Sequence, residues 1–305
     1  MENGESRAFA CVLSLGVPGV RVGLVQRGPV SLGGGPLPDG ALAELGRWAR
    51  RRGYAFLRFT HTDAGVLDAV AALPAGRRED AFPFYREPGT DLLVPQDLGD
   101  DELLARFQPV ARREIRKADA AGYRIESSDS PELLRAAWPL FQKLASRKGF
   151  NYRPLESFQS VLRAAAPCEA ARVFAVWDGE KMLQAIIVVR DGTTAHYVGG
   201  ALDAEALGKR ASPSELLHWR AMREFAARSV RWYNLGSRSG PVYQFKRKFR
   251  PTELDYPPAT TLVTNRLLFV LWSRMAMPLV RTHWTRLKRV AARVLGGKSA
   301  ATGSR

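Results

Sequence analysis

The stretch richest in potential chemistry is residues 243–249, YQFKRKF. Phe245 and Phe249 stand four residues apart, so one face of a turn there would be buried. Lys246 and Arg247 would then point into a groove, where a substrate could meet them. The alternative is a basic strand edge that faces solvent. We take Lys246 as the first candidate for a catalytic residue and Arg247 as a candidate for binding substrate.

Two further segments carry groups that suit an anion. The loop 236–240, GSRSG, could present backbone N–H groups to a phosphate, with Ser237 and Arg238 beside them. A plain strand-to-helix turn has the same composition. The segment 112–117 could clamp a diphosphate, or it could be a solvated helix face. Its basic residues are Arg112, Arg113, Arg116 and Lys117.

Aromatic and imidazole side chains also have simpler explanations than chemistry. Tyr197 and Tyr243 could line the groove and bind substrate, although core packing accounts for either of them alone. His196 and His218 are expected to be packed or surface residues rather than bases. The pattern therefore predicts substrate contacts from the two tyrosines and no imidazole catalysis.

The usual signatures of covalent or metal-dependent catalysis are missing. No Ser-His-Asp or Cys-His combination stands out, and the only cysteines, Cys11 and Cys168, form no C-x-x-C pair. The four histidines contain no H-x-x-x-H spacing. The sequence therefore predicts no metal site, and it argues against a disulfide scaffold.

The charge balance points to polyanionic partners. The chain has 305 residues, 46% of them hydrophobic, which is an ordinary globular composition. Lysine and arginine number 46 against 30 acidic residues, for a net charge of +16, and 37 of the 46 are arginines. Such a charge favours nucleic acid, nucleotide-linked substrates or an anionic membrane. Arginine bias from a GC-rich genome explains the excess equally well.

The two ends of the sequence differ. The N-terminus lacks the pattern of a secretory signal, so a cytoplasmic location is expected. Residues 256–305 contain no acidic residue and nine basic ones. The apolar runs LLFVLW and MAMPLV are too short to span a bilayer. Residues 266–295 are predicted to lie as an amphipathic helix on an anionic membrane surface; docking on the protein body and RNA contact are the alternatives.

Periodicity places these residues on mixed α and β elements. An early hairpin is expected over 8–30, and a helix over 100–122 with a kink at Pro109. A capping box, Ser212-Pro213-Ser214-Glu215, predicts a helix start. That helix is expected to end at about residue 228. The remaining expected helices are at 37–52, 130–148 and 154–165. Strands are expected at 54–59, 90–95, 123–127, 173–177, 182–190, 196–202 and 231–235.

Several motifs occur in an order that resembles the FemABX aminoacyltransferases, a Fem-like branch of the GNAT superfamily. The resemblance extends from about residue 20 to 262. Its motifs are RGPV (27–30), RREIRKA (112–118) with GYRI (122–125), GFNYRP (149–154), residues 197–201, 212–219 and 232–236, and the F-K-x-x-F element at 245–249.

The resemblance implies an α/β (α+β) fold of two GNAT-like subdomains, with mixed, mainly antiparallel sheets flanked by helices. The expected divisions are 1–150, N-terminally trimmed, then 151–262, a basic helical segment 263–295 and a disordered tail 296–305. It implies direct transfer of an aminoacyl or acyl group to an amine of a peptidoglycan-type precursor, with Lys246 at the reaction centre. The donor would be charged tRNA or acyl-CoA, and the acceptor would carry a nucleotide or an undecaprenyl group.

Departures from the family pattern keep two alternatives open. The tRNA-contacting helical insertion of some members is missing, and Asn234 stands where the family often has Asp. Residues 207–213, LGKRASP, do not fit the usual pyrophosphate loop of CoA-dependent enzymes. The alternatives are a Fem-like N-acyltransferase of surface polysaccharide or lipid biosynthesis with a non-tRNA donor, and a degenerate RNA- or lipid-binding protein.

Overall fold

The chain divides into two compact units in the computed structural model. Unit 1 comprises Met1–Gly89 and Tyr256–Arg305, and unit 2 comprises Thr90–Asp255. Structure is described for residues 8–17, 20–32, 35–60, 63–78, 89–150, 152–238 and 242–276. Unit 1 is therefore discontinuous in sequence, and unit 2 is the single segment inserted into it.

A five-stranded sheet, ordered β2-β3-β5-β14-β6, forms the body of unit 1. The strands of the unit are β1 (Ala8–Phe9), β2 (Val12–Val17), β3 (Val20–Gln26), β4 (Val30–Ser31), β5 (Tyr54–Thr60), β6 (Gly76–Arg78) and β14 (Thr260–Val263). The helices are α1 (Ala41–Arg51), α2 (Ala64–Ala72) and α10 (Arg266–Leu271), and α10 continues as a π-helical turn, Trp272–Ala276.

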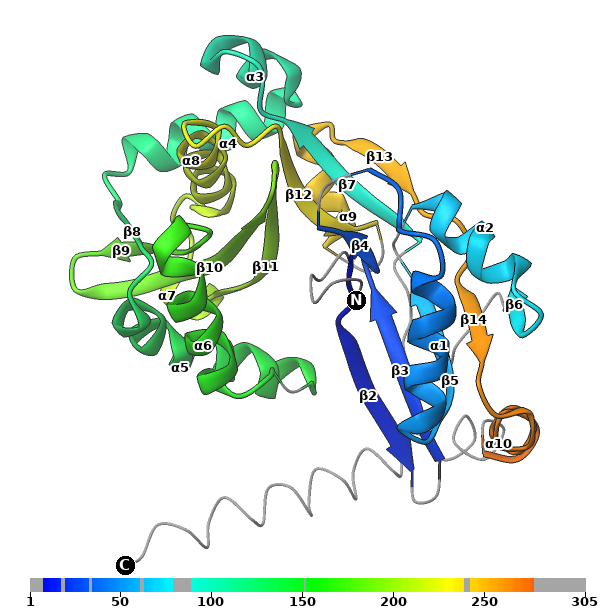
Figure 1. Ribbon diagram of the computed structural model, residues 1–305. Helices are drawn as coiled ribbons and strands as arrows, with labels where there is room; N and C mark the ends of the chain where they lie inside the picture. The colour runs from blue at the N-terminus through cyan, green and yellow to red at the C-terminus, as the bar shows by residue number, and fades with distance from the viewer. Residues whose placement is uncertain are drawn as a thin grey trace, which may run out of the picture. The chain divides into compact units, whose positions relative to one another are not determined.

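Helices cover both faces of this sheet: α1, seen over the strands in Figure 1, and α2 pack on one face, and α10 packs on the other. Every residue of β5 is buried. Because strand side chains alternate between faces, Leu57 and Phe59 pack in the cluster that includes α1 and α2, whereas Phe56 packs against α10. The burial of all of β5, including Arg58 and Thr60, thus reflects a central strand that is covered on both sides.

Unit 2 is built on a seven-stranded sheet ordered β13-β7-β12-β11-β10-β9-β8. The strands are β7 (Thr90–Pro95), β8 (Arg124–Ser128), β9 (Ala171–Asp178), β10 (Lys181–Asp191), β11 (Thr194–Leu202), β12 (Trp232–Ser237) and β13 (Thr252–Asp255). The helices are α3 (Asp100–Arg106), α4 (Pro109–Ala120), α5 (Pro131–Lys148), α6 (Leu155–Ala165), α7 (Ala204–Leu207), α8 (Ser214–Ala226) and α9 (Tyr243–Lys246), with 3-10 turns at Ala166–Cys168 and Arg247–Phe249. Of the pairings in this sheet, β11 with β12 is parallel and the others are antiparallel.

Alternation along β10 decides which helices cover which face of the sheet. Ile186 and Val188 belong to the core that includes α4 and α8, while Ala185 and Ile187 belong to the core with α5 and α6. Figure 1 shows the two helix pairs on opposite sides of these strands. The expected architecture, mixed sheets of mainly antiparallel strands flanked by helices, is confirmed.

Several expected elements are confirmed and two are wrong in detail. The early hairpin is present as β2 and β3. The helix expected over 100–122 is two helices, because Phe107 is extended and Pro109 begins α4 as its first residue. The capping box is also wrong: Pro213 is the N-cap of α8, and the Glu215 carboxylate lies 2.6 Å from Lys248 Nζ instead.

The two compact units follow other boundaries than the expected divisions. Residue 150 lies between α5 and α6, which pack on the same sheet. The chain returns to unit 1 at Tyr256, before the expected boundary at 262. Of the basic segment 263–295, the described part ends at residue 276, and the tail 296–305 lies outside the described residues. No helix within the described ranges is long and apolar enough to cross a membrane.

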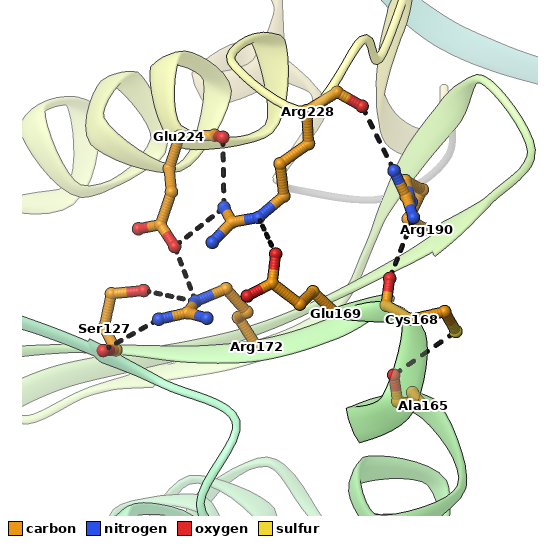
Figure 2. Close-up of polar contacts among 8 residues, drawn as sticks. All are labelled: Ser127, Ala165, Cys168, Glu169, Arg172, Arg190, Glu224 and Arg228. Atoms are coloured by element: carbon orange, nitrogen blue, oxygen red, sulfur yellow. Dashed lines mark hydrogen bonds and ion pairs between the residues drawn. The ribbon is translucent and has the colours of Figure 1, made fainter.

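An ion-pair cluster fixes the C-terminal end of α8 against β9 and β10 (Figure 2). The Glu224 carboxylate lies 2.5 Å from Arg172 Nε and 3.0 Å from Arg228 Nη1. Arg228 also pairs with Glu169 at 3.2 Å, and Arg190 donates to the Arg228 carbonyl at 3.1 Å. Since β12 begins a few residues after α8, this cluster sets where β12 starts.

Candidate functional site

The parallel ladder between β11 and β12 is short, and it ends beside the candidate residues. Only Thr194–His196 and Trp232–Asn234 pair, although the strands continue to Leu202 and Ser237. On the other side of β11, a register shift between Ile187 and Val188 of β10 leaves Val198 without a partner residue on β10. Past this point the facing edges of β11 and β12 do not bond to each other, so their backbone groups can serve a ligand.

Lys246 lies at this end of β12. Its side chain is 8% exposed, and Nζ donates to the Ser237 carbonyl at 2.9 Å. Burial lowers the pKa of Lys246, and the negative charge of Asp91 acts in the opposite direction. Gly236 has φ +77°, and a Cβ there would lie 3.6 Å from Nζ. The positive φ favours glycine at this position, whereas a Cβ at that distance would make only an ordinary contact with the lysine.

The aromatic side of the 243–249 turn is buried as the spacing predicts. Phe245 and Phe249 lie with ring centroids 5.5 Å apart, and both contact the ring of His218. Phe249 is fully buried. Lys246 is therefore mounted on a turn whose apolar half is fixed in the core of unit 2.

A buried polar network crosses three strands next to Lys246. Asn234 on β12 donates through Nδ2 to Asp91 Oδ2 on β7 at 2.6 Å, and the same nitrogen lies 3.2 Å from His196 Nδ1 on β11. Asn234 Oδ1 accepts from the Gly236 N–H at 2.7 Å. His196 Nε2 lies 3.0 Å from Asp191 Oδ1. The network fixes the turn from Asn234 to Ser237, which supplies the carbonyl that holds Lys246.

Neutral aromatic and imidazole groups surround the lysine turn. Desolvation lowers the pKa of His218 to about 3, with a further contribution from the Lys246 cation. His218 Nδ1 lies 3.0 Å from the Tyr233 hydroxyl. Burial raises the pKa of Tyr197, whose ring lies 4.7 Å from the His218 ring. His218 is packed, as expected, and neither ring carries charge near neutral pH.

Two of the predicted binding residues, Arg238 and Tyr243, contact a carboxylate that the sequence analysis missed, and a third, Arg247, lies over the Tyr243 ring. Glu253 on β13 lies 2.7 Å from Arg238 Nη1 and accepts from the Tyr243 hydroxyl at 2.9 Å. This hydrogen bond raises the pKa of Tyr243. The Arg247 guanidinium lies 5.7 Å from the Tyr243 ring centroid. Glu253 had no sequence signal beyond its charge, because its position depends on the pairing of β13 with β7.

The basic residues of α4 have different environments. Arg112 donates to the carbonyls of Ala105 at 2.8 Å and Phe107 at 3.2 Å, so it caps the end of α3. Lys117 lies 3.8 Å from the Glu114 carboxylate. Arg116 is exposed. A diphosphate clamp at this helix stays a prediction, and Arg113, Arg116 and Lys117 are its exposed members.

No cluster of three or more His, Cys, Asp or Glu side chains suited to a metal ion occurs among the residues that the structure describes.

Residues 105–247 match the family model described as "Acetyltransferase (GNAT) domain". This segment of the chain is a GNAT-type acyltransferase domain. The matched segment includes Lys246 and ends one residue after it.

Solved structures support a Fem-like fold for the acyltransferase. "Crystal structure of FemX" is 16% identical with a TM-score of 0.73, and the alignment covers 89% of this chain and 88% of that one. The C-terminal domain of a putative lysylphosphatidylglycerol synthetase from Agrobacterium fabrum is 13% identical, with a TM-score of 0.56 and coverage of 90% and 89%. L-PGS from Bacillus licheniformis is 13% identical, with a TM-score of 0.58 and coverage of 88% and 86%.

These likenesses show the fold, and they confirm the resemblance to Fem-like GNAT proteins that the motifs indicated. No curated protein matches the chain in sequence. The fold includes both sheets, since the alignment with FemX extends over most of each chain.

Proposed function

We propose that this acyltransferase joins an activated aminoacyl or acyl group to an amine of a peptidoglycan-type envelope precursor. The observation that carries the proposal is Lys246, a buried cation at the end of the short β11–β12 ladder. Cationic hydrogen-bond donors in a water-poor site stabilise an oxyanion far better than they do in water. Lys246 is the group best placed for that role among the described residues.

The reaction needs no covalent enzyme intermediate. The lone pair of the acceptor amine attacks the carbonyl carbon of an ester or thioester donor. The new C–N bond forms, the C–O or C–S bond to the carrier breaks, and the proton that the amine gives up ends on the leaving oxygen or sulfur of the carrier. One Nζ proton of Lys246 is bonded to the Ser237 carbonyl, which leaves two further N–H donors for the substrate.

The classes of donor and acceptor are inferred from the resemblance to the FemABX family and from the basic charge of the chain. The donor is charged tRNA or acyl-CoA, and no metal or further cofactor takes part. The acceptor carries a diphosphate, in a nucleotide or an undecaprenyl carrier. Arg116, Lys117, Arg238 and Arg247 are the proposed contacts for its negative charge, with Tyr197, Tyr243 and Ser237 beside the reacting groups. The protein would work in the cytoplasm, on the inner side of the membrane.

A second candidate is acyl transfer to a lipid or polysaccharide amine from a non-tRNA donor. One of the similar folds carries the name of a putative lysylphosphatidylglycerol synthetase, and another carries the name L-PGS. Both candidates use the same turn and the same lysine, so the choice of donor and acceptor separates them.

A transfer assay tests the proposal. Pooled radiolabelled aminoacyl-tRNAs, or acyl-CoA, are incubated with total envelope precursors and the full-length protein. We expect Lys246→Ala to lower kcat/KM by about 100-fold or more, as the loss of an oxyanion donor does. Lys181→Ala, which removes an exposed lysine of the same unit, is the control and should leave transfer unchanged.

The pH dependence of transfer gives an independent readout. Transfer that needs the Lys246 cation should be lost as the pH rises. Because burial lowers the pKa of Lys246, the midpoint of this loss should lie below 10.5, the ordinary pKa of lysine. Lys246→Arg should move that fall upward, since arginine stays protonated. Full activity in Lys246→Ala, or no transfer from any donor, would contradict the proposal.

A further inference from the structure

Helix α10 presents one apolar face to the protein and another to solvent. On the inner side, the rings of Phe269 and Trp272 lie 5.4 Å and 6.0 Å from Phe56 of β5, and Leu268 joins the same cluster. On the outer side, Leu267 is 69% exposed, Val270 43% and Leu271 39%. The helix is therefore docked on unit 1, and its outer apolar face is left uncovered among the described residues.

Exposed arginines lie beside this outer face. Arg266 and Arg274 flank it along the chain and are both exposed. The start of α10 is tied to the end of α1 through β5, because the Asn265 N–H donates to the Ala55 carbonyl at 3.0 Å. Residues 50–52, immediately before this part of β5, are three consecutive exposed arginines. Figure 1 shows α10 and the C-terminal end of α1 at the same end of unit 1.

The sequence around this face has no negative charge to balance the arginines. Residues 256–305 contain nine basic and no acidic residues. An apolar surface surrounded by arginines, with little to neutralise them, is complementary to an anionic bilayer: the apolar side chains enter the acyl boundary while the guanidinium groups contact lipid phosphates. A protein partner would need acidic side chains around an apolar patch to match this surface, whereas an anionic bilayer supplies both.

We propose that the outer face of α10, together with arginines 50–52, 266 and 274, binds an anionic lipid bilayer. The inference goes beyond the proposed reaction, since it concerns a surface of unit 1 and holds whatever the acyl acceptor is. Membrane binding and docking on the protein body were alternatives for this segment in the sequence analysis. The proposal combines them, because one face of α10 docks on unit 1 while the other contacts lipid.

Vesicle sedimentation of the full-length protein tests this inference. The probes are phosphatidylcholine vesicles with and without 30 mol% phosphatidylglycerol, at about 0.15 M salt, the physiological ionic strength. We expect binding to the anionic vesicles only. Leu267→Glu with Val270→Glu should weaken it at least tenfold, and Arg51→Ser should weaken it by about fivefold. The control is Val161→Glu, which places one glutamate at an exposed apolar position of α6 in unit 2 and should bind like wild type.

Each outcome bears on the proposal without any transfer assay. Loss of binding in the double variant with an unchanged melting temperature supports it, because both side chains are already exposed. Failure of wild type to bind, equal binding to neutral vesicles, or a double variant that binds like wild type would overturn it. A wild-type dimer in sedimentation velocity that the double variant abolishes, without vesicle binding, would show that a second copy covers this face instead.

Discussion

The hydrogen bond that Asn234 donates to Asp91 predicts how the free energy of unfolding of an Asn234→Asp variant changes with pH. Asn234→Asp changes one atom group, yet it replaces the amide that donates to Asp91 with a second carboxylate. The two oxygens would then lie near the 2.6 Å that now separates Asn234 Nδ2 from Asp91 Oδ2. Two carboxylates at that distance hold one proton between them, which raises the pKa of the pair.

The magnitude follows from burial and linkage. Asn234 is 2% exposed, and loss of a hydrogen bond to a charged group costs about 1.5–3 kcal/mol. The folded variant binds a proton that the unfolded chain has released above about pH 4, the ordinary value for Asp. Its free energy of unfolding should therefore fall relative to wild type by about 1.4 kcal/mol per pH unit, from about pH 4 up to the raised pKa, and then stay level.

Urea unfolding at a series of pH values between 4 and 8 measures this difference. Asn234→Leu is the matched control, because it removes the same hydrogen bonds, including the one to the Gly236 N–H, without adding a titratable group. This variant also takes a donor away from the buried Asp91, which raises the pKa of Asp91. Its loss of stability should therefore grow with pH over a narrower range than that of Asn234→Asp, in which two carboxylates share the proton. If Asn234→Asp follows the pH profile of Asn234→Leu, the amide does not donate to a carboxylate, and the reasoning is wrong.

Two further predictions concern Gly236, beside Lys246, and the arginines of α4. Gly236→Ala should lower both stability, by about 1–2 kcal/mol, and transfer, because φ is +77° in the turn whose Ser237 carbonyl holds Lys246 Nζ. Gly179→Ala, at φ +59° with nothing within 4 Å, should lower stability alone, as thermal melts and initial rates will show. Arg112→Ala should lower the melting temperature through the lost cap on α3, while Arg116→Ala should raise KM for a diphosphate-bearing acceptor at unchanged melting temperature. An Arg116→Ala variant with wild-type KM would remove α4 from the binding site.

Local patterns predicted the elements that carry the site. The spacing of Phe245 and Phe249 predicted a turn with one buried face, and the structure places both rings in the core. Periodicity also gave the strand order along the chain from β9 to β12. These features depend on neighbours within a few residues, so a single sequence contains the information.

Long-range pairing supplied what the sequence could not. Asp91 and Asn234 lie 143 positions apart, and only the pairing of β7 with β12 brings them together. The capping box failed for a similar reason: Glu215 is 2% exposed and meets Lys248, 33 positions away, rather than its own helix start. The composition of Ser212–Glu215 favours a cap, but a buried carboxylate gains more from a cation.

The discontinuity of unit 1 has a consequence for how the chain is made. Strand β14 pairs with β5 on one side and β6 on the other, so it occupies a place inside the sheet. A ribosome that has released β5 and β6 must still translate all of unit 2, Thr90–Asp255, before β14 emerges. At about 5–20 residues per second, this takes on the order of ten seconds or more. Throughout that interval an apolar strand edge waits for its partner, so unit 2 can complete its fold first and the nascent chain depends on chaperones or dilution to avoid pairing with its neighbours.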